Sequence, residues 1–555
     1  MQKVKQAGPG SADRTSCGAR PWLGSLRRGL VLLGLVLSLG LNTACGTGAQ
    51  GTEAGTRPEA QEQRTGQGGG RHLIFGDPTF NEANDIVGVN PQEGYSGWAC
   101  LRYGVGETLF RFDEEMRAQP WLAVGLKARD PLSWELELRP GISFSDGQPL
   151  SAGAVQACLE RLLKQLERAR ELLPITSMEA PDGAGGLRLI LHTERPLPSL
   201  QQLLGDPMTC MVEARALDAG KVLGTGPFTV QSLEPNRELI LERNSQYWGG
   251  PVRLAGFTVR SFSDGQSLQL ALQAGDIQGA QSVPYAAYPE LRARGFGIDQ
   301  VETSRCFFMQ WNLRKDLAQE AALREAVNLA LSREDFCQKL LQANAQPAAG
   351  PFPQQLAAAP KQEPPSQDLE RARSLLEEAG WRDSDGDGWR ERGGQRLSLK
   401  LLTYPSRPEL PVLANYAADC LRRIGVELKV EVSQEYKQRR KDDANWDLLA
   451  SSMVTAPLGE SSYFFRHVLT EKGVGNYGGF HDARVERLVA ELEIEADEAR
   501  RRSLTAELLG VVAEQRPCIF VAHLRMALVS APSVEGLRAW PSDFYIFDAQ
   551  TGLKD

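Results

Sequence analysis

The side chains that do chemistry in enzymes and metal sites are sparse in this sequence. The chain has five histidines, and none of them has the spacing of ligands to one metal ion. There is no GxxxxGK[ST] loop for phosphates, no HExxH zinc helix and no GxSxG nucleophile turn. We therefore predict no catalytic residue, no bound metal and no cofactor, and we interpret the chain as a protein that is not an enzyme.

One acidic segment has part of the pattern of a calcium loop. Asp383, Asp385 and Asp387 stand at its first, third and fifth positions, and Gly388 supplies the glycine. The loop should close with a glutamate at its twelfth position, where this chain has Gly394. We interpret the segment as an Asp/Gly turn.

The cysteines show no disulfide framework. There is no CxxC pair, and the number of cysteines after residue 45 is odd. We interpret most of them as small buried apolar residues. The seven are Cys100, Cys158, Cys210, Cys306, Cys337, Cys420 and Cys518.

The elements that must position the remaining polar residues alternate along the chain. Runs of apolar or alternating residues predict strands at 72–75, 133–139, 187–192, 238–242, 256–260, 397–402, 426–432 and 518–522. Helical spacing predicts helices at 151–163, 321–331, 369–379 and 411–424, and two more within 482–509. Strands separated by helices indicate an α/β fold with crossover connections.

The N-terminus reads as an export signal. Basic residues precede an apolar run at 30–41, which is shorter than the roughly 20 residues that span a bilayer. The small residues before Cys45 resemble a bacterial lipobox, so we predict a lipoprotein signal peptide at 1–44 and lipidation at Cys45. Residues 45–71 are polar and rich in glycine without apolar periodicity, which predicts a flexible tether.

Length and charge restrict the class further. A chain of 555 residues is too long for one small core. It has 62 Lys and Arg against 70 Asp and Glu, a net charge of −8. This balance argues against a protein dedicated to binding nucleic acid, because phosphate contacts need clustered basic residues.

Several longer segments, in order along about residues 73–545, resemble one family: the bacterial extracellular solute-binding proteins of the dipeptide, oligopeptide and nickel group (family 5), the substrate-binding lipoproteins of ABC transporters. The segments are PWLA at 120–123, WELELRPGISFSDGQPLSAGAV at 134–155, GTGPF at 224–228, ERNSQYW at 242–248, ALQAGDI at 271–277, LREAVNLALSR at 323–333 and AGWRDSDGDG at 379–388.

The resemblance implies a two-lobed periplasmic-binding-protein fold of the cluster C type, with a hinge between the lobes. Lobe one would comprise residues 73–303 plus 522–555, and lobe two residues 304–521. The lobes would close on a ligand by a hinge motion. The closed form would then dock on a membrane permease driven by an ATPase.

The ligand is less certain than the fold. The resemblance implies a peptide or related small solute, with a nickel or metal-chelate ligand as an alternative. The histidine that nickel-type relatives place near position 451 is Ser451 here. Two other classes remain open, a signalling relative that senses a peptide and an exported hydrolase. We expect an exported monomer, anchored by lipid in the periplasm or on the outer face of the cell membrane.

Residue chemistry and position in the resembling segments predict the ligand site. Aromatic rings would stack on the ligand, Arg305 would hold an anionic group, Glu460 would pair with an ammonium group, and hydroxyls would donate hydrogen bonds. The nine predicted ligand-binding residues are Trp98, Arg305, Trp311, Tyr404, Tyr436, Ser451, Ser452, Thr455 and Glu460.

Overall fold

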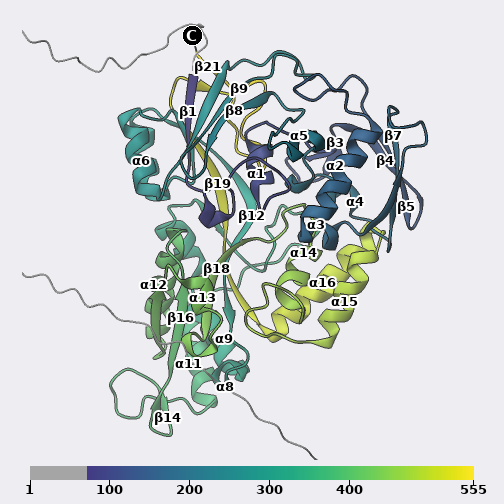
Figure 1. The fold of residues 1–555 in the computed structure, drawn as a ribbon. Coiled ribbons are helices and arrows are strands. Elements are labelled where there is room, and N and C mark those ends of the chain that lie inside the picture. Colours follow the sequence, from purple (N-terminus) through teal and green to yellow (C-terminus); the bar gives the residue numbers. More distant parts are fainter. Residues whose placement is uncertain (1–71, 555) are drawn as a thin grey trace, which may run out of the picture. The chain divides into compact units, whose positions relative to one another are not determined.

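The computed structural model describes residues 72–554. The predicted signal peptide, the lipidation at Cys45 and the predicted tether at 45–71 all lie outside these residues. Figure 1 shows the arrangement of the helices and strands.

One large mixed sheet forms the centre of the fold, in the order β17-β16-β18-β12-β19-β11-β1-β10-β9-β8, with β13 paired to β19. Its strands are β1 (His72–Asp77), β8 (Phe228–Glu234), β9 (Glu238–Arg243), β10 (Gly256–Ser261), β11 (Gly279–Gln281), β12 (Gly297–Trp311), β13 (Ala345–Pro347), β16 (Ser398–Thr403), β17 (Glu427–Val432), β18 (Leu448–Val454) and β19 (Cys518–Ser530).

Four smaller sheets complete the strand inventory of the described chain. A four-stranded antiparallel sheet has the order β4-β5-β7-β6, and the other three are two-stranded. Their strands are β2 (Phe110–Phe112), β3 (Ala118–Pro120), β4 (Ala123–Asp130), β5 (Ser133–Leu138), β6 (Ile175–Glu179), β7 (Arg188–Thr193), β14 (Glu391–Arg392), β15 (Gln395–Arg396), β20 (Val534–Glu535) and β21 (Gly552–Leu553).

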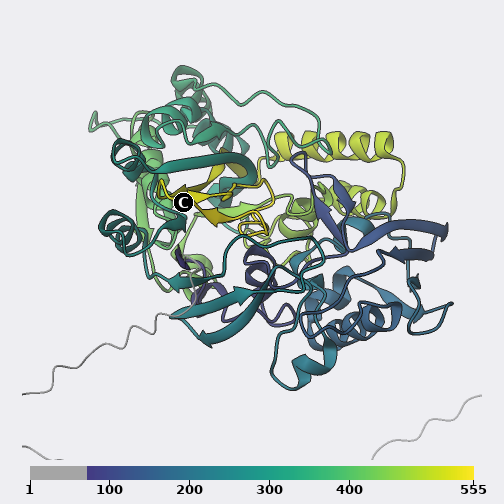
Figure 2. The same cartoon turned by 90° about the horizontal axis from the view of Figure 1, so that it is seen from above.

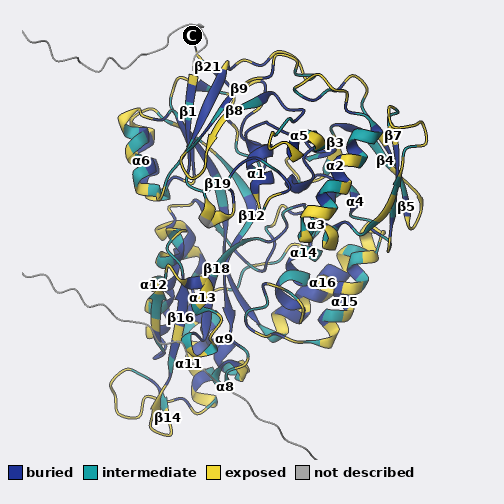
Figure 3. Cartoon of the chain, viewed as in Figure 1, coloured by how far each residue is buried: buried dark blue, intermediate teal, exposed yellow. Residues whose placement is uncertain are grey.

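The helices flank these sheets, and the outer ones turn their exposed faces away from the sheets (Figure 3). They are α1 (Ser96–Arg102), α2 (Ala152–Gln165), α3 (Glu167–Leu172), α4 (Leu200–Leu203), α5 (Ala214–Asp218), α6 (Gly265–Ala274), α7 (Tyr288–Ala293), α8 (Asp316–Gln319), α9 (Ala321–Ala330), α10 (Arg333–Asp335), α11 (Leu369–Glu378), α12 (Glu409–Arg422), α13 (Tyr436–Arg439), α14 (Ser462–Phe464), α15 (Ala483–Ile494) and α16 (Glu498–Gln515). No helix within residues 72–554 has the length and apolar composition needed to cross a membrane.

Two long strands connect two separate groups of core residues. Residues from 73 to 298, with others from 527 to 549, form the cores around β1 and α2. Residues from 306 to 524 form the cores around α12 and α16. Strands β12 and β19 pair antiparallel and run through both groups (Figure 1). The fold is therefore the two-lobed α/β class that the sequence predicted, while the lobe boundaries at 303–304 and 521–522 stay a prediction.

The ladder between β12 and β19 is interrupted where the chain passes between the two cores. Glu302 faces Arg525 and Cys306 faces His523, so three residues of β12 lie opposite one of β19. In the interruption, Thr303 donates its hydroxyl to the carbonyl of Leu524 at 2.9 Å. Bulges of this kind re-aim a side chain, and here they bring Arg305 to the lining of a cavity.

The GTGPF segment at 224–228 crosses another stretch of backbone at close range. A Cβ atom on Gly224 would overlap the carbonyl oxygen of Val105, and one on Gly226 would overlap that of Gly104. Between these glycines, Thr225 donates its hydroxyl to the buried Glu107 at 2.8 Å. The carboxylate also accepts hydrogen bonds from Tyr247 and Trp248, at 2.7 Å each. Glu107 thus joins two of the segments that resemble the family.

Burial raises the pKa of Glu107 from 4.5 to about 7, against the lowering effect of its three hydrogen-bond donors. Between these two values the folded state holds a proton that the unfolded state has released. Stability from this group is therefore fully present below pH 4.5 and is lost as the pH rises to about 7, by about 1 kcal/mol per pH unit. We expect Glu107→Gln to remove this part of the slope, as measured by urea unfolding at pH 5 to 8.

The exposed Glu137 on β5 provides the matched control. Glu137→Gln should leave the pH dependence of the unfolding free energy unchanged. If Glu107→Gln and the wild-type chain have parallel stability curves from pH 5 to 7, Glu107 is ionised in the folded state and the predicted proton uptake is wrong.

Candidate functional site

The candidate site is a cavity of about 290 Å³ between the two lobes. One wall comes from α1, α3 and the segment at 195–206, and the other from the end of β18, α14 and the helices α15 and α16. The blue strands and helices of 123–193 and the yellow-green helices α15 and α16 lie on the same side of the central sheet (Figures 1 and 2). The volume is near the lower end of small-ligand pockets, which run from about 300 to 1,000 Å³.

Four of the nine predicted residues line this cavity: Trp98, Arg305, Ser452 and Glu460. The sequence separates them by up to 362 positions, and the packing of the two lobes brings them together.

Trp98 lies on α1 and is half-buried. Its indole packs edge-on against Phe544, with ring centroids 5.1 Å apart. The guanidinium of Arg102 lies 4.9 Å from the ring centroid, within the range of a cation–π contact. Because neighbours on two sides fix the ring, Trp98 presents a preorganised aromatic surface to the cavity.

Ser452 presents a buried hydroxyl without a hydrogen-bond partner among the described residues. Its backbone amide donates to the hydroxyl of Tyr404 at 3.3 Å, which fixes the strand beside the cavity. Because an unpaired buried hydroxyl costs free energy, a ligand that supplies a partner gains from it. This geometry favours the predicted role of Ser452 in ligand binding.

Glu460 lines the cavity but is already engaged. Arg501 of α16 donates a charge-assisted hydrogen bond to its carboxylate. Burial raises the pKa of Glu460, and the nearby Arg501 acts in the opposite direction. A ligand ammonium would have to compete with this guanidinium, which weakens the case for the predicted ammonium contact.

The other five predicted residues do not line this cavity. They also do not line a second cavity, which shares Arg305 and Arg407 with the first. Trp311 is fully buried in the core around α9. Thr455 is also fully buried and donates its hydroxyl to backbone carbonyls of Ser304 and Pro351. Both side chains thus serve packing in this structure, and their ligand contacts stay predictions.

Tyr404, Tyr436 and Ser451 form a cluster behind the cavity wall. The rings of Tyr404 and Tyr436 pack edge to face with centroids 4.7 Å apart. The hydroxyls of Tyr436 and Ser451 share a hydrogen bond of 2.8 Å. Trp446 completes the cluster from within the core.

We expect Tyr436→Phe to lower the free energy of unfolding by about 1 kcal/mol, because it removes the hydrogen bond to Ser451 and leaves the ring in place. Affinity for the bound solute should stay within twofold of wild type. Urea unfolding and isothermal titration calorimetry measure the two quantities. If Tyr436→Phe is as stable as wild type but binds the solute markedly more weakly, Tyr436 contacts the ligand, as the sequence predicted.

Sequence reasoning missed most of the charged lining. Arg102, Arg168, Arg407 and Asp206 bring charge to the cavity and Phe544 brings an aromatic ring, yet none belongs to a motif that marks it as functional. Arg168 and Asp206 pair across the cavity rim at 2.9 Å, although 38 residues separate them. For the arginines, the only signal in the sequence was the residue type. The chain has 62 Lys and Arg residues, so residue type alone does not single out those that line the cavity.

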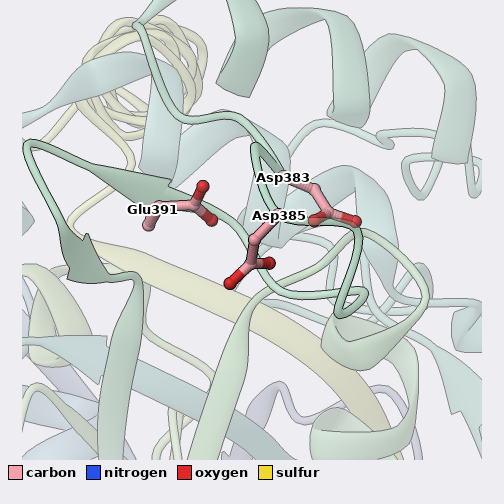
Figure 4. A group of neighbouring side chains, drawn as sticks. All are labelled: Asp383, Asp385 and Glu391. Carbon is pink, nitrogen blue, oxygen red and sulfur yellow. The ribbon is translucent and has the colours of Figure 1, made fainter.

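The acidic segment forms the turn that the sequence predicted (Figure 4). Asp383 accepts hydrogen bonds from the backbone amides of Gly386 and Gly388 at 2.8 and 3.1 Å. Asp385 accepts from the amide of Asp387 at 3.1 Å, and Glu391 from that of Ser384 at 2.6 Å. Their carboxylates lie within 4.8 Å of one another, but these local bonds account for the arrangement without an ion.

Among the residues found to line the cavity there is no histidine or cysteine. His467 stacks on Tyr463 beside the cavity, and burial lowers its pKa to about 4. All seven cysteines of the described chain are buried and unpaired, as the sequence predicted for most of them. The lining thus offers guanidiniums, hydroxyls and aromatic rings rather than ligands for a bare transition metal.

Comparison with known proteins identifies the family of this chain. The sequence model of the "Bacterial extracellular solute-binding proteins, family 5 Middle" matches residues 117–476. The nickel-binding protein NikA of Staphylococcus aureus is 22% identical over 82% of this chain and 90% of its own length. The oligopeptide-binding protein AppA of Bacillus subtilis is 24% identical over 79% of this chain and 84% of its own.

Solved structures of the same two proteins share the fold. NikA of S. aureus in complex with Ni(L-His)2 superposes with a TM-score of 0.74 and 22% identity, covering 87% of this chain and all of NikA. AppA of B. subtilis in complex with a nonapeptide gives a TM-score of 0.69 and 20% identity, covering 88% of this chain and 99% of AppA. With the family match over more than half of its length, this chain belongs to the bacterial extracellular solute-binding proteins, family 5.

Proposed function

We propose that this chain is the substrate-binding component of an ABC importer and is not an enzyme. It captures a small solute between its lobes and delivers it to a membrane permease. The observation that supports this most directly is the cavity itself, which is lined from both lobes and contains an aromatic ring, a free hydroxyl and several guanidiniums. A metal ligand, the alternative within the same family, would have to arrive as a chelate, because the described lining has no imidazole or thiolate.

The lobe boundaries are part of this proposal, with lobe one at 73–303 plus 522–555 and lobe two at 304–521. The core clusters and the interruption of the β12–β19 ladder support these bounds to within a few residues, since Ala522 and Leu524 still pack in the core of the second lobe. The loop after β18 touches the other lobe, since Leu458 packs into the core around α2. Gly459 approaches the carbonyl of Met116 so closely that no Cβ would fit. These contacts are what a conformation closed over the cavity requires.

Native mass spectrometry of the purified full chain tests the proposed function. The expected result is a bound solute that is released when the protein unfolds. Adding the solute back to the refolded protein should decrease the radius of gyration measured by small-angle scattering. A protein that carries no solute after purification and shows no compaction with any periplasmic extract would contradict a carrier function. The released mass also separates a peptide ladder from a single chelate.

We further propose export and lipid anchoring at Cys45, with residues 45–71 as the tether. Cys45→Ala is expected to move most of the protein from the membrane fraction to the soluble fraction, because the acyl chains supply the membrane affinity. Cys17→Ala is the matched control. Equal membrane association of the Cys45→Ala and wild-type proteins would rule out this anchor.

A further inference from the structure

The cavity carries more positive than negative charge. Seven arginines line it, against three carboxylates, and no lysine is among the residues found at its wall. Lining a 290 Å³ space with this many guanidiniums is costly, because burial removes water that would otherwise solvate them. Each arginine therefore needs a partner, in the protein or in the ligand.

Five of the seven have a carboxylate of the chain within 4.0 Å, and three of these five use carboxylates of the lining itself. Arg168 pairs with Asp206 at 2.9 Å, and Arg466 lies 3.5 Å from Glu493. Arg501 pairs with Glu460. These three pairs use all the carboxylates that line the cavity.

The fourth paired arginine, Arg102, uses a carboxylate from just outside this lining. Its guanidinium binds Asp543 at 2.5 Å, and Asp77 lies 3.9 Å away. Arg305 reaches only the same Asp543, at 3.6 Å. Arg102 and Arg305 thus share Asp543, while Asp77 is within reach of Arg102 alone.

Arg195 and Arg407 are left without a carboxylate partner among the described residues, and Arg305 has only the Asp543 carboxylate that it shares with Arg102. Within residues 72–554, neither Arg195 nor Arg407 has a carboxylate within 4.0 Å. Burial and repulsion by Arg407 lower the pKa of Arg305 to about 10. Glu409, the nearest further carboxylate on α12, forms no ion pair at that distance, and burial raises its pKa.

Arg305 and Arg407 also line a second cavity of about 290 Å³, which shares Thr79, Asn84 and Val454 with the first. The two guanidiniums therefore stand where the two spaces meet. A ligand group placed between them is accessible from both sides, so the ligand can extend past the pair.

We propose that the solute is a small anion with at least two carboxylate or phosphate groups, one held between Arg305 and Arg407 and another facing Arg195. This inference rests on the proposed carrier function and specifies its substrate class. Guanidiniums bind both kinds of oxyanion in bidentate geometry, and such bonds are about twice as strong as neutral ones. A cationic solute would meet, within the described lining, two unpaired guanidiniums and a third that shares its only carboxylate.

Thermal unfolding of the purified full chain, freed of bound solute by dialysis, tests the proposal. The probes are tricarballylate, pyrophosphate and trilysine at about 10 mM, with ionic strength held constant by sodium chloride. Either anion should raise the wild-type Tm by about 3–5 °C. Arg305→Gln and Arg407→Gln should weaken the apparent affinity for it by about tenfold or more. Arg237→Gln, an exposed arginine paired with Glu234, should respond as wild type.

A second readout separates a binding role from a structural one. Without ligand, Arg407→Gln should unfold about 1–2 °C higher than wild type, because it removes repulsion from Arg305. A rise in Tm with tricarballylate alone would identify a carboxylate ligand, and a rise with pyrophosphate alone would identify a phosphate ligand. Stabilisation by trilysine only, no response to either anion, or an undiminished response in both arginine variants would each overturn the proposal.

Failure of this inference is distinguishable from failure of the carrier function. A neutral or cationic solute found by native mass spectrometry would leave the carrier function in place and refute the anionic ligand. Absence of any solute together with absence of compaction would refute the carrier function, whatever the anions do to the Tm.

Discussion

Replacing Asp543 with asparagine is expected to lower the free energy of unfolding by about 3 kcal/mol. Asp543 is the carboxylate shared by Arg102 and Arg305. Removing one partner of a buried ion pair leaves an uncompensated charge, which costs about 3–5 kcal/mol, and Asp77 near Arg102 limits the loss to the lower end. Urea unfolding at pH 7 measures the change.

Asparagine is the suitable substitution because Asp543 has a φ of 61°, a left-handed conformation that asparagine tolerates. The backbone is therefore preserved while the charge is removed. Asp182→Asn breaks the exposed pair with Arg188 and should change the free energy of unfolding much less than Asp543→Asn does. Equal effects of the two substitutions would mean that Asp543 does not compensate buried charge.

The Asp543 network also explains how the first lobe holds its side of the cavity. Arg102 donates to the carbonyl of Asp543 at 2.9 Å and to the hydroxyl of Thr79 at 3.1 Å. Asp77 accepts from Tyr103 at 2.6 Å. These bonds tie α1 to the end of β1 and to the C-terminal segment. The ring of Trp98 and the side chain of Arg305 are thus held from three distant parts of the chain.

Local patterns predicted most of the regular elements, because the signals that end a helix or fill a strand face are local. Ser151 accepts a hydrogen bond from the amide of Ala154 and begins α2 as expected. Asp368 does the same for α11, and Gly380 follows that helix with a positive φ. Strand β12 was not among the predicted strands, because its apolar residues are concentrated at 306–311, while 297–302 is largely polar and partly exposed.

The site was predicted less completely, for a physical reason. Trp98, Arg305 and Ser452 were found from residue type and position, and they do line the cavity. The partner of Glu460 was not found, because Arg501 arrives from α16, 41 residues later, through tertiary packing. The same holds for Arg407, which enters from the loop before α12. No spacing rule connects residues that only the closing of two lobes brings together.

Trp98→Ala is expected to weaken binding of the copurified solute by about 10- to 100-fold. Truncating a fixed aromatic side chain in a ligand contact costs roughly 1.5–3 kcal/mol, which corresponds to that range of Kd. Trp98 is fixed by Phe544 and Arg102 before the ligand arrives, so little entropy is lost on binding. Titration of the protein stripped of solute measures the change.

Two further variants decide whether the loss comes from the ligand contact. Trp98→Phe keeps an aromatic face and should recover much of the affinity. Trp389→Ala removes a half-buried tryptophan of the acidic turn, which lines neither cavity, and should leave affinity unchanged. If Trp98→Ala binds as wild type does, the solute occupies the space around Arg305 and Arg407 alone, and α1 serves only as a wall.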